Sequence, residues 1–278
     1  MRNTSIFADR APISTLRDQQ PGAVFFLHIP KTGGVTMRTL LRDVYGPGAL
    51  CPYTALEDLA SASPSQFREY PVVAGEFPFY VSELLTRPLF SFTFLRDPVE
   101  RTLSVYKHLR RDVNHPDHAR MAEVADLAEF LAHPALRTHV VNAQTRFLGC
   151  HSDLAQQLER CRRDALTPEA SRPYLKAPIR QAADEVTLRQ ALVNLEKISF
   201  VGATERFAEC CRALFNRLGF KEPLPIPKAN CAPAKQGPRL EDLDPGMVAA
   251  IRRVTRFDRH LYAVARRRVE DSLGRAEA

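Results

Sequence analysis

A lysine, two glycines and a threonine follow a strongly apolar segment near the start of the chain. The segment covers residues 23–29, and the next residues read Pro30-Lys31-Thr32-Gly33-Gly34-Val35-Thr36. Adjacent glycines let the backbone approach a ligand closely, and a helix that starts there offers unpaired N–H groups and its positive dipole end. Lys31 adds a full positive charge, and Thr36 adds a hydroxyl. The spacing therefore predicts a loop that binds phosphate.

The position of the lysine separates this loop from the ATP-binding P-loop. In that motif the lysine follows the glycines, as in G-x-x-x-x-G-K-[ST], whereas Lys31 precedes Gly33 and Gly34. No acidic strand end that would bind Mg²⁺ is obvious. A P-loop nucleotide kinase stays as an alternative that magnesium-dependent ATP turnover would favour.

A second polar cluster follows the apolar segment 89–95. Asp97 is a typical helix N-cap, and Pro98 suits the first helical position. Arg96 can bind an anion through two parallel N–H groups, and Ser104 offers a neutral donor. On its own, Arg96 could equally be the ion-pair partner of a carboxylate beside a helix cap.

Together the two clusters resemble the sulfotransferases, especially the type 2 branch of carbohydrate and heparan sulfate 2-O-sulfotransferases. P-K-T-G-G-x-T is similar to that family's 5′-phosphosulfate loop, and R-D-P-x-x-R followed by S-x-Y to its 3′-phosphate segment. The resemblance implies that PAPS (3′-phosphoadenosine 5′-phosphosulfate) is the donor and PAP the product, with no metal. It assigns the donor to Lys31, Thr32, Gly33, Gly34 and Thr36, with Arg96 and Ser104 at the 3′-phosphate.

Two later segments extend the resemblance over roughly residues 22–232. V-N-A-Q-T-R-F-L-G at 141–149 is similar to the family's N-x-Q-T-R-x-L segment, and F-V-G-A-T-E-R-F at 200–207 to its strand-to-helix corner. Asn230 resembles an asparagine in the loop that closes over the nucleotide. The implied acceptor is a hydroxyl of a carbohydrate or glycoconjugate, although a lipid, an antibiotic or another small metabolite stays open.

Glu76 stands where many type 2 relatives carry the histidine of G-H-x-P-F. The chain reads Gly75-Glu76-Phe77-Pro78-Phe79 at this place. A carboxylate is a weak base for an alcohol unless apolar surroundings raise its pKa, and the flanking aromatic residues could supply them. We therefore expect Glu76 to deprotonate the acceptor. The alternatives are that Glu76 pairs with a cation of the site, or that the chain is an inactive PAP(S)-binding module.

Strands that alternate with helices predict an α/β fold: a single domain with a central, mainly parallel sheet flanked by helices, similar to P-loop proteins. Strands are expected at 23–29, 71–76, 89–95 and 198–202, and helices at 35–44, 98–110, 121–132, 136–147, 152–163, 179–195, 204–218 and 245–268. The Pro-rich stretch 164–178 is expected to be a loop near the acceptor. Residues 1–20 should be a flexible leader and 21–270 the sulfotransferase domain. Because ligands bind beyond the carboxyl ends of parallel strands, the clusters after 29, 75 and 95 should share one site.

Composition sets wider limits. The chain has 278 residues and a formal charge of +7, which suits a protein that holds polyanions, but no nucleic-acid motif accompanies the charge. Six cysteines without C-x-x-C or zinc spacing predict reduced thiols, and no signal peptide or membrane-spanning stretch is visible. We therefore expect a cytoplasmic protein. Oligomeric state cannot be read.

Several charged residues have simpler interpretations. His28 is expected to be a satisfied strand-end residue, and Arg101 an ion-pair partner rather than a ligand. His115 and His118 could bind a metal, but no third ligand is apparent and a solvated loop is favoured. The basic stretch of the last helix is expected to be a solvated face, with an acidic acceptor or a membrane surface as the alternative. Its arginines are Arg252, Arg253, Arg256, Arg259 and Arg266 to Arg268.

Overall fold

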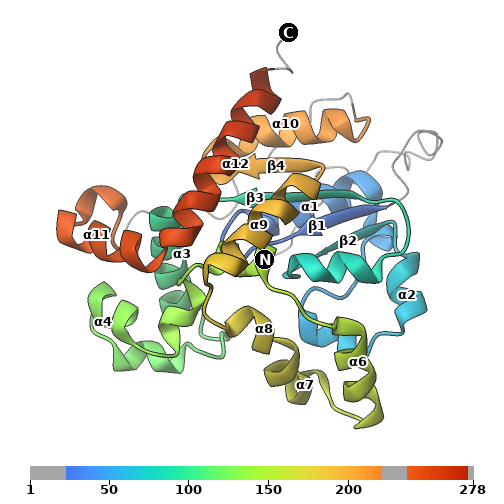
Figure 1. The fold of residues 1–278 in the computed structure, drawn as a ribbon, viewed down its shortest axis with the longest axis horizontal. Coiled ribbons are helices and arrows are strands. Elements are labelled where there is room, and N and C mark those ends of the chain that lie inside the picture. Colours follow the sequence, from blue (N-terminus) through green and yellow to red (C-terminus); the bar gives the residue numbers. More distant parts are fainter. Residues whose placement is uncertain (1–22, 221–236, 275–278) are drawn as a thin grey trace.

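Four parallel strands form the centre of the protein. The computed structural model describes residues 23–220 and 237–274 (Figure 1). The strand order is β2-β1-β3-β4, and the strands are β1 (Val24–Leu27), β2 (Val72–Gly75), β3 (Phe90–Leu95) and β4 (Phe200–Ala203). Every neighbouring pair runs parallel, so all four carboxyl ends lie at one edge of the sheet. The predicted α/β fold with a parallel sheet is confirmed.

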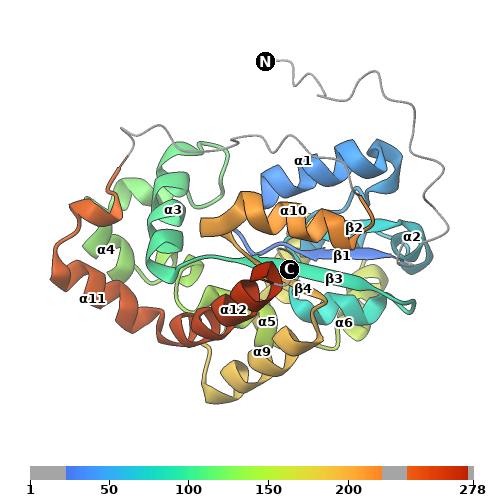
Figure 2. The ribbon, with the colours of Figure 1, turned by 90° about the horizontal axis from the view of Figure 1, so that it is seen from above.

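Helices cover both faces of this sheet (Figure 2). One face carries α1 (Gly34–Tyr45) and α10 (Phe207–Arg217), and the other carries α5 (Ala143–Gly149), α9 (Glu185–Lys197) and α12 (Arg256–Gly274). Because both faces are covered, the strands are continuous apolar runs rather than alternating ones. All residues of β1, β2 and β4 are buried.

A second group of helices lies beyond the carboxyl edge of the sheet, at the left of Figure 1. It consists of α3 (Pro98–Arg111), α4 (Leu127–Ala132) and α11 (Pro245–Val254), which share a separate apolar cluster. The predicted start of α3 is confirmed, because the Asp97 carboxylate accepts hydrogen bonds from the amides of Val99 (2.9 Å) and Glu100 (3.1 Å). This group places the end of α3 beside the carboxyl edge.

Two predicted long helices are broken, and a single contact explains both breaks. The helix expected at 136–147 is a 3-10 turn (Leu136–His139) followed by α5, and the helix expected at 245–268 is α11 followed by α12. Between the first pair, Asn142 adopts a positive φ of 44°. Its Oδ1 accepts the amide hydrogen of Phe257 in the first turn of α12 at 2.9 Å. Asn142 is therefore the N-cap residue of α5, while its side chain caps the first turn of α12.

The Pro-rich stretch 164–178 was expected to be a loop, and that prediction is wrong. It holds α7 (Pro168–Leu175) and the start of α8 (Ala177–Arg180). Thr167 caps α7 by accepting the Ala170 amide hydrogen at 3.3 Å, and Pro168 takes the first position, where its missing N–H costs nothing. Pro168 and Pro178 mark helix starts, and Pro173 lies within α7.

The remaining elements differ from the expectations mainly at their ends. The helix expected at 121–132 is a 3-10 turn (Ala119–Glu123) followed by α4, and α9 begins six residues later than expected because Asp184 caps it. The other elements are α2 (Pro64–Glu69), α6 (Leu154–Arg163) and the 3-10 turns η2 (Pro47–Ala49), η3 (Leu56–Ala60), η4 (Phe79–Leu84), η7 (Thr204–Arg206) and η8 (Leu240–Asp242).

Some predictions fall on residues outside the described ranges. The leader 1–20 and the loop residue Asn230 both lie there. Among the helices of the described ranges, none is long and apolar enough to cross a bilayer.

The carboxylate of Asp258 in α12 fixes the start of α5. It accepts the amide hydrogen (2.7 Å) and the hydroxyl hydrogen (2.8 Å) of Thr145, together with the amide hydrogen of Gln144 (3.2 Å), and it is 1% exposed. We expect Asp258→Ala to lower the free energy of unfolding by roughly 3 kcal/mol, because buried donors lose a charged acceptor. Urea denaturation measures this change. Asp271→Ala, on the exposed side of the same helix, should change it by no more than about 0.5 kcal/mol; equal losses in the two variants would contradict the prediction.

Candidate active site

The predicted phosphate loop connects β1 to α1 in a constrained conformation. Lys31 has a φ of 72°, and Gly33, the N-cap of α1, has a φ of 90°. A positive φ is costly for a lysine and persists only where the surroundings enforce it. The Thr32 hydroxyl contributes by donating to the carbonyl of Ile29 at 2.8 Å. The loop therefore presents the first, unpaired N–H groups of α1 next to Lys31.

The second glycine is required by packing against His28. A Cβ on Gly34 would lie 1.9 Å from Nε2 of that ring. His28 is buried, and its pKa is lowered to about 3 by burial and by the charges of Arg38, Lys31 and Arg101. The neutral ring stacks on Phe26, with 5.6 Å between centroids. His28 thus supports the loop by packing against Gly34 at the end of β1.

Arg96 lies at the carboxyl end of β3, beside the phosphate loop. The side-chain amide of Gln144 binds the backbone of Arg96 through two hydrogen bonds. The Arg96 amide donates to Gln144 Oε1, and Gln144 Nε2 donates to the Arg96 carbonyl, each at 2.9 Å. Its guanidinium lies 3.5 Å from the Lys31 carbonyl and 3.3 Å from Glu100 Oε2. The structure therefore brings Arg96 and Lys31 together, as predicted.

Ser104 lies two turns into α3, and its side chain is half-buried. Its hydroxyl makes no hydrogen bond to any residue in the described ranges. His108 and Arg111 follow at helical spacing, so the three side chains share one face of the helix. Burial, and then the charge of Lys31, lower the pKa of His108 to about 4, and the charge of Arg111 lowers the pKa of Lys31. This face of α3 therefore borders the phosphate loop.

Arg101 has a different partner from the one expected. It is 2% exposed, and instead of an ion pair it forms hydrogen bonds to two carbonyls, those of Pro30 (3.0 Å) and His139 (3.1 Å). Burial lowers its pKa to about 10, so the group stays charged near neutral pH. Arg101 is a positioning residue for the phosphate loop.

The corner between β4 and α10 ties the two nucleotide segments together. The Thr204 hydroxyl lies 3.2 Å from the Thr32 carbonyl and 3.0 Å from the Leu95 carbonyl. Glu205 accepts the Asp97 amide hydrogen at 2.8 Å and the Tyr262 hydroxyl hydrogen at 2.6 Å. The corner that carries the later part of the resemblance thus fixes the spacing between the loop of Lys31 and the start of α3.

Lys31 provides an uncompensated positive charge at this edge. The side chain is half-buried, and no carboxylate among the residues described lies within hydrogen-bonding or ion-pair distance of its ammonium group. Its pKa is lowered by burial and by nearby Arg111, Arg96 and Arg101, and only Glu76 opposes them. Several cations around one half-buried ammonium form a site for a polyanion.

Glu76 follows β2 at the same edge and is held by its backbone. Its amide donates to the Thr54 carbonyl at 2.7 Å. Glu76 is exposed at the surface, yet the surrounding protein still raises its pKa by loss of solvation, while Lys176 and Lys31 act in the opposite direction. Across the described ranges its carboxylate has no hydrogen-bonded or ion-paired partner. The alternative that Glu76 forms an ion pair with a site cation is therefore not what the structure has.

The neighbouring cation, Lys176, has its own carboxylate. Its Nζ lies 2.9 Å from Glu57, which also accepts from Arg172 Nε at 2.8 Å. Burial raises the pKa of Glu57, but these two cations outweigh it and the net shift is downward. The sequence analysis missed Lys176 because it predicted a loop where α7 lies. Thr167 followed by Pro168 is the sequence signal for the start of α7.

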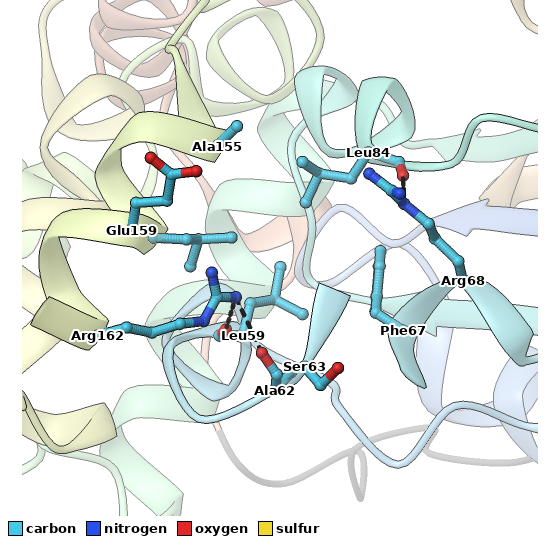
Figure 3. A pocket seen from close by; sticks show the side chains of 10 residues that line it. Leu59, Ala62, Ser63, Phe67, Arg68, Leu84, Ala155, Glu159 and Arg162 are labelled. Atoms are coloured by element: carbon cyan, nitrogen blue, oxygen red, sulfur yellow. Dashed lines mark hydrogen bonds between the residues drawn. The ribbon is translucent and has the colours of Figure 1, made fainter. Parts of the chain in front are cut away.

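An apolar hollow opens on the other side of η3 from this ion pair cluster. It has a volume of about 140 Å³, and Figure 3 shows Leu59, Phe67 and Leu84 on its walls. Its two arginines are engaged with backbone carbonyls, Arg68 with Leu84 and Arg162 with Ala62, each at 2.9 Å. None of the predicted donor residues lines it, so the chemistry belongs to the strand ends instead.

The predicted basic face of the last helices contains a hollow. Arg252, Arg253, Arg256 and Arg259 line an open hollow where α11 meets α12. Arg256 lies 3.7 Å from Glu185, so this face is only partly neutralised. Binding of an acidic acceptor or a membrane there stays a prediction.

Comparison with known proteins agrees with this geometry. No curated protein matches the chain. A model described as the sulfotransferase family matches residues 16–263, which include the phosphate loop, Glu76, Arg96 and Ser104. Because the match covers most of the chain, the protein belongs to the sulfotransferase family.

Proposed function

We propose that this sulfotransferase uses PAPS as its donor and transfers the sulfuryl group to a hydroxyl of a carbohydrate or glycoconjugate. The observation that carries the proposal is the half-buried ammonium of Lys31, which lacks an anionic partner among the described residues and lies among arginines at the carboxyl edge of the sheet. The 5′-phosphosulfate suits the loop of Lys31, and the 3′-phosphate suits Arg96 and Ser104. The carbohydrate acceptor rests on the resemblance to type 2 sulfotransferases.

The reaction is an in-line displacement at sulfur. The acceptor oxygen forms a bond to sulfur while the bond from sulfur to the oxygen of the 5′-phosphate breaks, and PAP leaves. Lys31 and the N–H groups of α1 stabilise the charge that develops on the leaving phosphate. Glu76 takes the hydroxyl proton, for which its raised pKa makes it a better base than an ordinary glutamate. Holding donor and acceptor in line supplies much of the remaining rate.

Lys31→Met should abolish most turnover by removing this charge. We expect kcat to fall by roughly 10²–10³, the usual loss when one donor to a developing negative charge is removed. Release of PAP from PAPS, with a panel of glycans and small alcohols, measures the rate. The control is Lys197→Met, because Lys197 ends α9 and precedes β4, at the opposite edge of the sheet. Retained turnover in Lys31→Met, or magnesium-dependent ATP turnover by the wild type, would contradict the proposal.

Glu76→Gln should lower kcat by about 10²–10⁴, the range of general-base catalysis, while PAP still binds. The base must be deprotonated, so wild-type activity should fall as the pH drops through the pKa of Glu76. Because that pKa is raised, the acidic limb of the pH–rate profile should lie above the pH of an ordinary glutamate. Glu83→Gln, an exposed carboxylate in η4, is the matched control. Full activity of Glu76→Gln with an unchanged acidic limb would remove Glu76 as the base.

Arg96→Gln should weaken binding of PAP by roughly 10- to 100-fold, which corresponds to about 1.5–3 kcal/mol for charged hydrogen bonds. Binding of adenosine 5′-monophosphate, which lacks the 3′-phosphate, should change much less. Calorimetric titration with the two nucleotides measures the difference, and Ser104→Ala should shift it in the same direction. Equal losses for both nucleotides would mean that Arg96 does not contact the 3′-phosphate.

A further inference from the structure

Two histidines and an aspartate converge next to the loop that follows α3. One ring nitrogen each of His115 and His139 and one carboxylate oxygen of Asp117 lie within 4.8 Å of one another, and all three side chains are half-buried. The two rings are 5.4 Å apart between centroids, at an angle of 71°. His115 and Asp117 come from the loop, whereas His139 ends the 3-10 turn before α5. We call these residues the His115–Asp117–His139 triad.

His118, the histidine that the sequence pairs with His115, takes no part in the triad. Its Nδ1 lies 2.8 Å from the carbonyl of Leu109, which satisfies that nitrogen locally. The third ligand that sequence spacing does not supply is His139, 24 residues after His115 in the chain. Folding, rather than sequence proximity, completes the set.

The donor atoms of the triad carry lone pairs or a readily exchanged proton. His115 Nδ1 accepts the amide hydrogen of Asp117 at 3.0 Å, so this nitrogen has a lone pair and no proton. His139 Nε2 lies 2.8 Å from Asp117 Oδ2 and shares a proton with it. Asp117 Oδ1 accepts from Arg120, which leaves Oδ2 as the oxygen directed at the histidines. A cation can replace the shared proton.

We propose that the His115–Asp117–His139 triad binds one divalent transition-metal ion, and that Zn²⁺ suits its ligands. Two imidazoles with one carboxylate suit zinc, cobalt, nickel or copper, whereas Mg²⁺ and Ca²⁺ select sets made wholly of oxygen. Binding releases the proton between His139 Nε2 and Asp117 Oδ2 to solvent. Three protein ligands leave a fourth position for water.

The ion would connect the loop 112–118 to Arg101, the residue that positions the phosphate loop. The carbonyl of His139 accepts from Arg101, and Arg101 also donates to the Pro30 carbonyl just before Lys31. His115 lies close enough to Glu76 for their charges to interact. A bound ion therefore fixes residues 112–118 beside both sides of the proposed sulfuryl-transfer site, without contacting the reacting atoms. Sulfuryl transfer itself does not require it.

The experiment measures metal binding directly, so its outcome does not depend on the proposed activity. The full chain is freed of metal with a chelator and titrated with ZnCl₂ by calorimetry. We expect one equivalent to bind, and Asp117→Asn and His139→Gln each to weaken binding by about tenfold or more. His133→Gln is the matched control, because His133 is also paired with a carboxylate, Glu123 at 3.0 Å, but lies in no triad. It should bind Zn²⁺ like the wild type.

The variant Arg120→Gln keeps all three ligands, and we expect it to change the affinity for Zn²⁺ in the opposite direction. Arg120 competes for the Asp117 carboxylate, so its removal should tighten Zn²⁺ binding. Circular dichroism of the metal-free variants establishes that they are folded. Co²⁺ should give the visible absorption of a site with nitrogen and oxygen ligands. Failure of the wild type to bind Zn²⁺, equal affinity of all variants, or a sulfur-to-cobalt charge-transfer band that reports cysteine ligands would each overturn the proposal.

Discussion

The loop of Lys31 depends on one buried guanidinium. Arg101 joins the carbonyl of Pro30 to that of His139, which lie 71 and 38 residues from it in sequence. The planar fork of arginine suits this task because its N–H groups point in fixed directions, and burial still leaves its pKa at about 10. A lysine could not make both contacts with the same geometry. The positive φ of Lys31 lies directly after the carbonyl that Arg101 holds, so the strain of the loop is supported by a charged hydrogen bond.

The same arrangement gathers like charges at the carboxyl edge of the sheet. The charges of Arg111, Arg96 and Arg101 lower the pKa of Lys31, so holding its ammonium here in the charged form is a cost to the folded protein. A ligand that carries several negative charges relieves this repulsion, whereas a neutral ligand leaves it in place. Buried Gln144 and Asp258, together with exposed Glu205, oppose the repulsion by fixing backbone positions rather than by neutralising the cations. Affinity for a polyanion is thus built in at the expense of stability.

The sequence predicts the sheet and the start of α3 well because the signals there are local. Buried parallel strands are continuous apolar runs, and Asp97-Pro98 is a helix start that requires no tertiary contact. The breaks at Asn142 and Thr255 could not be predicted, because Asn142 caps a helix that begins 114 residues later. The helix α7 was missed because prolines were counted as loop formers instead of being read by position. Arg101 was expected to meet a carboxylate, since a sequence does not show which carbonyls a buried arginine will find.

The missed helix matters most at the acceptor side. Lys176 directly follows α7, and its charge is the strongest influence on the pKa of Glu76 after the loss of solvent. If Lys176 formed an ion pair with Glu76, the carboxylate would be stabilised and would lose its basicity. Glu57 prevents this by holding Lys176 at 2.9 Å together with Arg172, which keeps the cation near Glu76 but directed elsewhere. A glutamate can then stand in the place of a histidine, because a second glutamate takes up the charge that would otherwise neutralise it. The protonation of Glu76 therefore depends on the ion pairs of Glu57, because these hold the cation that would otherwise stabilise its carboxylate.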